Sequence, residues 1–145
     1  MIAIDTNLLV YAHRPEMPFH ERVRQVMAGA VGDPEPVAVP WPCVHEFLAV
    51  VSNPRIFQDP TPMDLALDAI RRLLNSLSGG LLAEGEGYLD AFERIARPAH
   101  LQGAVVHDAR IAVLCLYHGV RVLWSADRDF SRFPKLAVAN PLPLG

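Results

Sequence analysis

The sequence predicts an α/β domain with a central, mainly parallel β-sheet. Short runs of β-branched and apolar residues alternate with longer segments of helical period, which is the order typical of βαβ units. With 145 residues, of which 51% are hydrophobic, the chain is long enough to bury a core without disulfides or a structural metal. We therefore expect residues 1–145 to form one domain.

The first half of the chain predicts two strands and three helices. Val23, Met27 and Ala30 recur at spacings of three and four, which is the period of an amphipathic helix. Pro54 has no backbone N–H donor and disfavours a helical residue before it, so it ends the third helix. In order, we expect a strand at Ile2–Asp5, helices at Asn7–His13 and Phe19–Val31, a strand at Val37–Val39 and a helix from Pro42 to Asn53.

The second half alternates in the same way. Thr61 followed by Pro62 is a typical helix start, with Thr61 as the capping residue, and Gly79-Gly80 ends that helix. Pro98 is expected to stop a later helix. The remaining elements are a weak strand at Leu81–Ala83, helices at Tyr88–Arg97 and Val105–His118, strands at Val120–Trp124 and Leu136–Ala139 with a short helix or turn at Ala126–Phe133 between them, and an irregular tail at Asn140–Gly145.

Isolated carboxylates in apolar segments are the informative feature. Asp5 is the only charge in the first strand and helix, and Glu46 is the only formal charge in the helix around it. Asp108 lies on the apolar face of its helix, and Asp127 and Asp129 come soon after an apolar strand. An ionised carboxylate that is buried alone costs several kcal/mol or more, so each of these acids needs a cation or a proton.

The predicted topology brings these acids together. Asp5 and Asp127 both follow strands, and the carboxyl ends of parallel strands meet at one crevice of an α/β sheet. Glu46 and Asp108, each near the start of a helix, would flank that crevice. Oxygen ligands without histidine or thiolate favour a hard divalent ion, Mg²⁺ or Mn²⁺.

Each acid taken alone also has a purely structural interpretation. Asp5 and Asp127 could cap the helices that follow them. Glu46 could lie on a solvated stripe, and Asp108 could be a favourable charge in a first helical turn. Helix capping explains where these acids stand, but it does not explain why no other charged residue lies near them. Four such acids in four separate apolar elements therefore favour a shared site.

Four short motifs surround the isolated acids. They are Ile2-Ala3-Ile4-Asp5-Thr6-Asn7-Leu8-Leu9, His45-Glu46-Phe47-Leu48, His107-Asp108-Ala109-Arg110-Ile111-Ala112 and Ser125-Ala126-Asp127-Arg128-Asp129-Phe130. In this order they resemble the motifs of PIN-domain ribonucleases, and most of all those of the toxins of VapBC toxin–antitoxin systems. The resemblance covers the whole chain apart from residues 54–100, which have no comparable motif. It implies a PIN-like three-layer α/β/α fold.

The resemblance also implies an activity and a site. The expected activity is that of a Mg²⁺- or Mn²⁺-dependent endoribonuclease, the toxin of a type II toxin–antitoxin system. Matching the family's motifs, Asp5, Glu46, Asp108 and Asp127 are the expected acidic metal ligands and catalytic groups, and Asp129 is a further acid of the same site. The residues expected to orient these ligands are Thr6, Asn7 and Ser125.

Partners and location follow from the same resemblance. It implies an RNA substrate, a cognate VapB-type antitoxin that occupies the groove near the acids, and a homodimer. Arg14 and Arg128 are expected to contact RNA because they lie near the ends of motifs. The first apolar segment is too short to cross a membrane, and Cys43 and Cys115 lack zinc-type spacing, so we expect buried thiols in a cytoplasmic protein without membrane attachment.

Two other classes compete with a nuclease. A phosphotransferase of the haloacid-dehalogenase type would need a second aspartate two residues after Asp5, and Asn7 stands there. A catalytically inactive PIN-like or receiver-like domain would use the same acids to hold a regulatory ion and would bind Mg²⁺ without cleaving RNA.

The net charge of -3 argues at first against a nucleic-acid substrate, which usually meets a basic surface. Without the five acids of the expected site, however, the chain carries 13 basic and 11 acidic side chains, a formal charge of +2. The negative charge is therefore expected to be concentrated in one pocket.

Overall fold

A five-stranded sheet lies at the centre of the computed structural model, which describes residues 1–143. Its spatial order is β3-β2-β1-β4-β5, and every neighbouring pair is parallel. The α/β class is thus confirmed, with a sheet that is parallel throughout. The strands are β1 (Ile2–Ile4), β2 (Val37–Pro40), β3 (Gly80–Leu82), β4 (Val122–Trp124) and β5 (Val138–Ala139).

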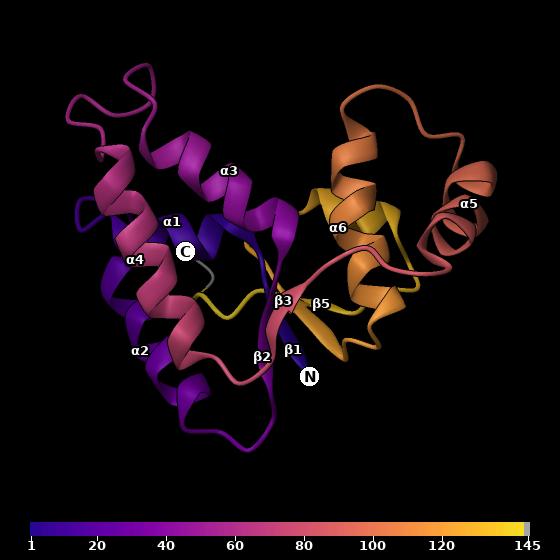
Figure 1. The fold of residues 1–145 in the computed structure, drawn as a ribbon, viewed down its shortest axis with the longest axis horizontal. Coiled ribbons are helices and arrows are strands. Elements are labelled where there is room, and N and C mark those ends of the chain that lie inside the picture. Colours follow the sequence, from indigo (N-terminus) through magenta and orange to yellow (C-terminus); the bar gives the residue numbers. More distant parts are fainter. Residues whose placement is uncertain (144–145) are drawn as a thin grey trace.

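Helices cover both faces of this sheet, which gives the expected three layers (Figure 1). Helices α1 to α4 lie on one side of the sheet, and α5, α6 and the short 3₁₀-helix η1 lie on the other. None of the helices within residues 1–143 has the length and apolarity needed to cross a membrane. The bounds are α1 (Thr6–His13), α2 (His20–Val31), α3 (Trp41–Val51), α4 (Met63–Ser76), α5 (Tyr88–Ala99), α6 (Val105–Tyr117) and η1 (Asp129–Arg132).

The core lies on both sides of the central strand. All three residues of β1 are buried, because helices cover both of its faces and β2 and β4 flank it. A continuous apolar strand is the pattern expected of such a position. Cys43 of α3 and Cys115 of α6 are both buried and free, which confirms the expectation of buried thiols.

Two predicted helix boundaries are wrong. Thr61 does not cap α4, because its hydroxyl contacts His13 Nε2 at 2.9 Å and accepts a hydrogen bond from Arg14 at 3.0 Å; the helix has no side-chain cap. Pro98 does not stop α5 but lies in its last turn, where a missing N–H costs only one hydrogen bond. The helix ends at Ala99, and the capping residue His100 has a left-handed φ of 49°.

The last two strands are shorter than the sequence predicts. β4 begins at Val122 instead of Val120, and β5 begins at Val138 instead of Leu136. Residues 140–143 form neither helix nor strand, as expected for the proline-broken tail. The rest of that prediction falls on Leu144 and Gly145, which lie outside the described residues.

An ion pair at the amino edge of the sheet ties β4 to the loop before β2. The Arg121 guanidinium donates two hydrogen bonds to Glu35, with Nε–Oε1 and Nη2–Oε2 distances of 2.7 and 2.8 Å. The Met1 amino group also donates to Glu35 Oε1, at 3.1 Å. These donors, Arg121 first, lower the pKa of Glu35 from its ordinary value of 4.5 to about 2.

Replacing Glu35 with glutamine should remove a pH-dependent part of the stability. Because the folded-state pKa is depressed, the carboxylate stabilises the fold above pH 4.5, and this contribution disappears as the pH falls toward 2. We expect the wild type to melt at a higher temperature than Glu35→Gln at neutral pH, with the difference closing as the solution is acidified. Thermal unfolding across this range is the measurement; a constant difference would contradict the assignment.

Candidate active site at the carboxyl edge of the sheet

The site lies where the order of the strands reverses. The connections from β1 to β2 and from β2 to β3 cross one face of the sheet, and the connection from β3 to β4 crosses the other (Figure 1). A crevice opens outside the carboxyl ends of the two strands at such a point, here β1 and β4. Ile4 pairs with Trp124, so the residues that follow, Asp5 and Ser125, lie side by side.

Asp5 is buried and held by several donors. Its Oδ1 accepts hydrogen bonds from the Thr6 backbone N–H at 2.8 Å and from the Cys43 thiol at 3.6 Å. Its Oδ2 accepts from the Ser125 hydroxyl at 2.6 Å and from Asn7 Nδ2 at 3.5 Å. Burial raises the pKa of Asp5, although these hydrogen bonds oppose the rise. Asp5 therefore caps α1 and also belongs to the acidic cluster, so the two interpretations of this residue are compatible.

Asn7 and Ser125 connect Asp5 to the loop after β4. Asn7 donates to Ser125 Oγ at 3.3 Å and accepts a hydrogen bond from the Ala126 N–H at 3.2 Å. The Asp127 N–H in turn donates to Ser125 Oγ at 2.9 Å. Ser125, at the centre of this network, is 2% exposed, so water competes little for its hydrogen bonds. The polar residues that the sequence places beside the acids do contact them.

Glu46 reaches the same crevice from α3. The Thr6 hydroxyl donates a hydrogen bond to Glu46 Oε2 at 2.6 Å. Thr6 therefore binds two acids, Glu46 through its hydroxyl and Asp5 through its backbone N–H. The negative charge of Glu46 contributes to the raised pKa of Asp5. Since α3 starts directly after β2, its first turns project toward the carboxyl edge of the sheet.

Four of the expected acids line one open cavity of about 250 Å³. Asp5, Glu46 and Asp127 are joined there by Asp108 from the first turn of α6. Ile111 lines the same cavity, which confirms that Asp108 and Ile111 share a face of α6. The remaining lining residues are Thr6, Asn7, Val10, Tyr11, Val50 and Phe130.

The charges of this cavity repel one another. The pKa of Asp108 is raised, first by partial burial and then by the negative charges of Asp127, Asp129 and Glu46, with Arg132 opposing the rise. Within residues 1–143, none of the five acids forms an ion pair with a basic side chain. Arg110, two residues from Asp108, pairs with Glu84 instead. The cavity thus carries negative charge that no nearby side chain neutralises.

The donor chemistry fits a hard divalent cation, but the side chains are not arranged as a finished ligand set. Carboxylate oxygens without thiolate or imidazole are the donors that Mg²⁺ and Mn²⁺ prefer. In the described part of the chain, no three side chains of the His, Cys, Asp and Glu types lie close enough together to coordinate one ion. Asp5 is fixed by its donors, whereas the carboxylate of Asp108 accepts no hydrogen bond from residues 1–143 and is therefore free to turn toward an ion.

Three further predicted residues lie outside the cavity lining. Asp129 is exposed on η1, and its N–H donates to Asp127 Oδ1 at 2.8 Å, so it lies beside the site. Arg128 is exposed on the same loop. Arg14 lies elsewhere: it donates to Glu16 and Thr61 and covers the Phe57 ring at 4.2 Å. Cys43 and Arg132, which the sequence did not single out for the site, contact Asp5 and influence Asp108, respectively.

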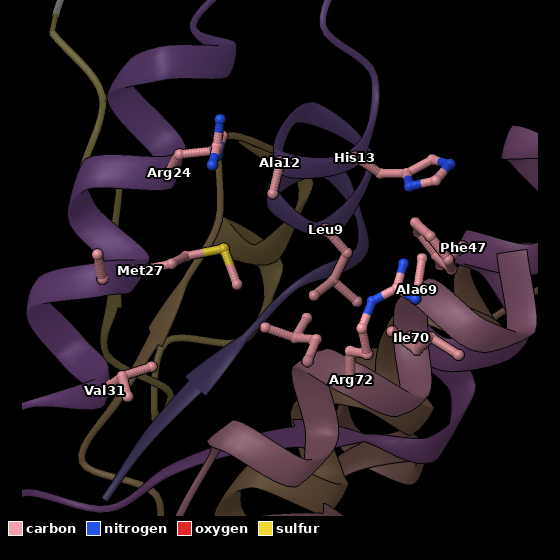
Figure 2. A pocket seen from close by; sticks show the side chains of 12 residues that line it. Leu9, Ala12, His13, Arg24, Met27, Val31, Phe47, Ala69, Ile70 and Arg72 are labelled. Carbon is pink, nitrogen blue, oxygen red and sulfur yellow. The ribbon is translucent and has the colours of Figure 1, made fainter. Parts of the chain in front are cut away.

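A second cavity, of about 300 Å³, lies between α1, α2, α3 and α4 (Figure 2). Leu9, Met27, Phe47 and Ile70 form an apolar lining, and basic side chains, among them Arg72, lie around it. It contains no carboxylate and is distinct from the acidic cavity, so it offers apolar surface but no hydrolytic chemistry.

A comparison with protein families matches the PIN domain over residues 2–136. The chain therefore belongs to the PIN-domain family, as the parallel sheet and the acids at its switch point indicate. Among curated proteins it is similar to VapC ribonuclease Mb2897 of Mycobacterium bovis, with 34% identity over 142 residues that cover 98% of this chain and 96% of that protein. It is also similar to ribonuclease VapC48 of Mycobacterium tuberculosis, with 28% identity over 137 residues and 94% of each chain.

Solved structures share the fold. FitAB bound to an IR36 DNA fragment matches with a TM-score of 0.72 and 23% identity, covering 100% of this chain and 98% of that one. VapC20 of Mycobacterium tuberculosis, described as a toxin that cleaves the sarcin-ricin loop, matches with a TM-score of 0.63 and 18% identity over 90% and 93% of the two chains. VapBC2 of Rickettsia felis, bound to a promoter DNA fragment, matches with a TM-score of 0.67 and 16% identity over 97% and 98%.

Proposed function

We propose that this protein is a Mg²⁺- or Mn²⁺-dependent endoribonuclease and the toxin of a type II toxin–antitoxin system. The observation that carries the proposal is the meeting of Asp5, Glu46, Asp108 and Asp127 in one cavity at the switch point of the sheet, with no ion pair among the described residues. Relatives named VapC ribonucleases, similar over nearly the full length, support the choice of RNA as substrate.

In the proposed mechanism Asp5, Glu46, Asp108 and Asp127 would hold the cation, and hydrogen bonds from neighbouring residues keep three of these acids in place. A bound divalent ion supplies a water of lowered pKa and neutralises charge that develops on the phosphodiester. Asp5 is fixed by its donors, and Thr6 holds Glu46. Asp127 is oriented through the Asp129 N–H, which occupies its Oδ1. No side chain needs to act as a nucleophile.

An RNA-cleavage assay tests the proposal. The purified protein should cleave RNA internally with Mg²⁺ or Mn²⁺ present, and EDTA should stop cleavage until the ion is restored. Cleavage that persists undiminished in EDTA would contradict metal dependence.

A second candidate is a regulatory PIN-like or receiver-like domain that binds an ion without hydrolysis. The observation that favours it is that both carboxylate oxygens of Asp5 already accept hydrogen bonds from the protein, as a structural carboxylate does. Such a domain would bind Mg²⁺ in a titration and leave every RNA intact. These two results together would contradict the nuclease assignment and support the regulatory domain.

Replacing Ser125 with alanine should weaken the site without unfolding the protein. The change removes a 2.6 Å donor to Asp5 and leaves the Asp127 N–H without its acceptor. Loss of such a supporting group typically lowers activity about 10- to 100-fold and stability by about 1–2 kcal/mol. RNA-cleavage rates and urea unfolding are the measurements. Ser76→Ala is the control, since the exposed Ser76 hydroxyl bonds only the Leu73 carbonyl of its own helix; an equal effect at both positions would contradict the role.

A VapB-type antitoxin is the proposed protein partner. The structural neighbours are described as VapBC2 and FitAB bound to DNA. A basic side chain of the partner near Asp5 or Asp108 would compete with the metal for the same negative charge. Finding a short open reading frame directly upstream that encodes a small DNA-binding protein would support this part of the proposal.

Assembly and location complete the proposal. We expect the protein to form a homodimer and to be located in the cytoplasm, where RNA and a newly made antitoxin are both present. Sedimentation of the isolated protein measures the oligomeric state directly.

A further inference from the structure

A third cavity, of about 250 Å³, carries three basic side chains. Arg94 comes from α5, Arg132 from the end of η1 and Lys135 from the loop before β5, and all three are exposed. Its other lining residues are mostly apolar: Ile95, Pro98, Ala99, Leu116, Phe133 and Pro134. We call this the basic cavity.

The cations of the basic cavity have no protein partner in the described part of the chain. No acid lines the cavity, and none of the three basic residues forms an ion pair within residues 1–143. Other arginines nearby behave differently, since Arg97 pairs with Glu93 and Arg110 with Glu84. The positive charge of the basic cavity is therefore available to an external anion.

Arg132 connects this cavity to the acidic one. It also lines a neighbouring cavity of about 450 Å³ together with His100 and Val105. Val105 lies one turn before Asp108 on the same face of α6. Phe130, two residues before Arg132 in the same short helix η1, lines the acidic cavity. Helix η1 therefore lies between the two cavities, with Arg132 on the side of the basic cavity.

We propose that Arg94, Arg132 and Lys135 bind phosphates of the RNA strand that leads into the acidic cavity. The inference rests on the proposed ribonuclease function and adds the surface along which the RNA strand approaches the acidic cavity. Unpaired cations above an apolar floor are the chemistry that single-stranded nucleic acid requires, because cations contact the phosphates and apolar surface contacts the bases. Arg14, which the sequence predicts as an RNA contact, is held by Glu16 and Thr61 instead.

Binding of RNA as a function of salt concentration tests this inference. A short fluorescein-labelled single-stranded RNA is titrated with the Asp108→Asn protein, which is expected not to cut it, and with the same protein carrying Arg94→Gln, Arg132→Gln and Lys135→Gln. We expect at least about tenfold weaker binding, and a plot of log affinity against log salt that is shallower by about 2, since each lost phosphate contact removes about 0.7 from a single-strand slope.

The control is Arg71→Gln in the Asp108→Asn background. Arg71 is exposed on α4, which packs on the other side of the sheet, and it has no ion pair within residues 1–143. It should change neither affinity nor slope. Because Arg94, Arg132 and Lys135 are exposed, we expect the added substitutions to leave the circular dichroism spectrum and melting temperature of the Asp108→Asn protein unchanged.

The outcomes separate this inference from the proposed function. If the wild type cleaves RNA and the triple substitution leaves affinity and slope unchanged, the inference fails and the nuclease stands. If the triple substitution weakens RNA binding but the wild type cleaves no RNA with Mg²⁺, the surface stands and the nuclease assignment fails. If the triple substitution abolishes binding of an acidic protein partner and leaves RNA binding intact, the inference fails and the basic cavity binds a protein ligand instead.

Discussion

Replacing Asp108 with asparagine is expected to lower the rate of RNA cleavage by about a thousandfold, because the change removes one negative oxygen from the proposed metal site. Asparagine has nearly the same shape, and Asp108 makes no side-chain hydrogen bond within residues 1–143 that the change would break. The loss should therefore appear in catalysis and in Mg²⁺ affinity, measured by cleavage kinetics and by calorimetric titration.

The same substitution should slightly stabilise the metal-free fold. The charges of Asp127, Asp129 and Glu46 all disfavour an ionised Asp108. Removing that charge relieves the repulsion, and because the group is only partly buried we expect the gain to stay below about 1 kcal/mol. Urea unfolding in EDTA measures it. Asp64→Asn, in the exposed first turn of α4, is the matched control and should leave cleavage unchanged. A variant of Asp108 that cleaves RNA at the wild-type rate would remove this residue from the site.

Replacing Gly79 with alanine is expected to destabilise the fold by about 2–3 kcal/mol, because a methyl group has no room there. A Cβ atom at this position would lie 2.6 Å from both the carbonyl carbon and oxygen of Val37 and 2.9 Å from the Ala38 Cβ. The Gly79 N–H also donates to the Val37 carbonyl at 2.8 Å, so relief of the contact would pull β3 away from β2.

Gly29 provides the comparison for Gly79. It lies within α2, and a Cβ atom there would meet nothing within 4 Å. Gly29→Ala should stabilise the protein by about 0.5–1 kcal/mol, since alanine is the better helix former. Chemical unfolding of the two variants under the same conditions should give shifts of opposite sign. A destabilised Gly29→Ala or a neutral Gly79→Ala would contradict the packing described here.

The fold could be predicted well from the sequence because its elements carry strong periodic patterns. The alternation of apolar runs and amphipathic segments locates every helix and strand, with errors confined to the ends. Those errors arise from contacts distant in sequence. Thr61 is adjacent to Arg14 and His13 only in the folded chain, so its hydroxyl is not available to cap α4. Pro98 is tolerated because it falls in the final turn of α5.

The candidate site could be predicted in part. The acids stand out because they are isolated charges in apolar segments, and the strand ends of a parallel sheet bring them together. Contacts from residues of no special pattern could not be foreseen. Cys43 resembles any buried thiol until its 3.6 Å contact with Asp5 is known. Arg14 lies close to the first motif in sequence, yet Glu16 and Thr61 hold it outside the acidic cavity.

The hydrogen bond between Ser125 and Asp5 joins residues that are 120 positions apart. During translation, β1 and Asp5 leave the ribosome before β4 and Ser125, which follow 120 residues later. At about 5–20 residues per second, several seconds separate the two events. Over that time the first strand has no β4 to pair with and Asp5 lacks its shortest hydrogen bond. The acidic site is therefore incomplete on every nascent chain from which Ser125 has not yet emerged, and until then the translating ribosome is not exposed to an assembled site.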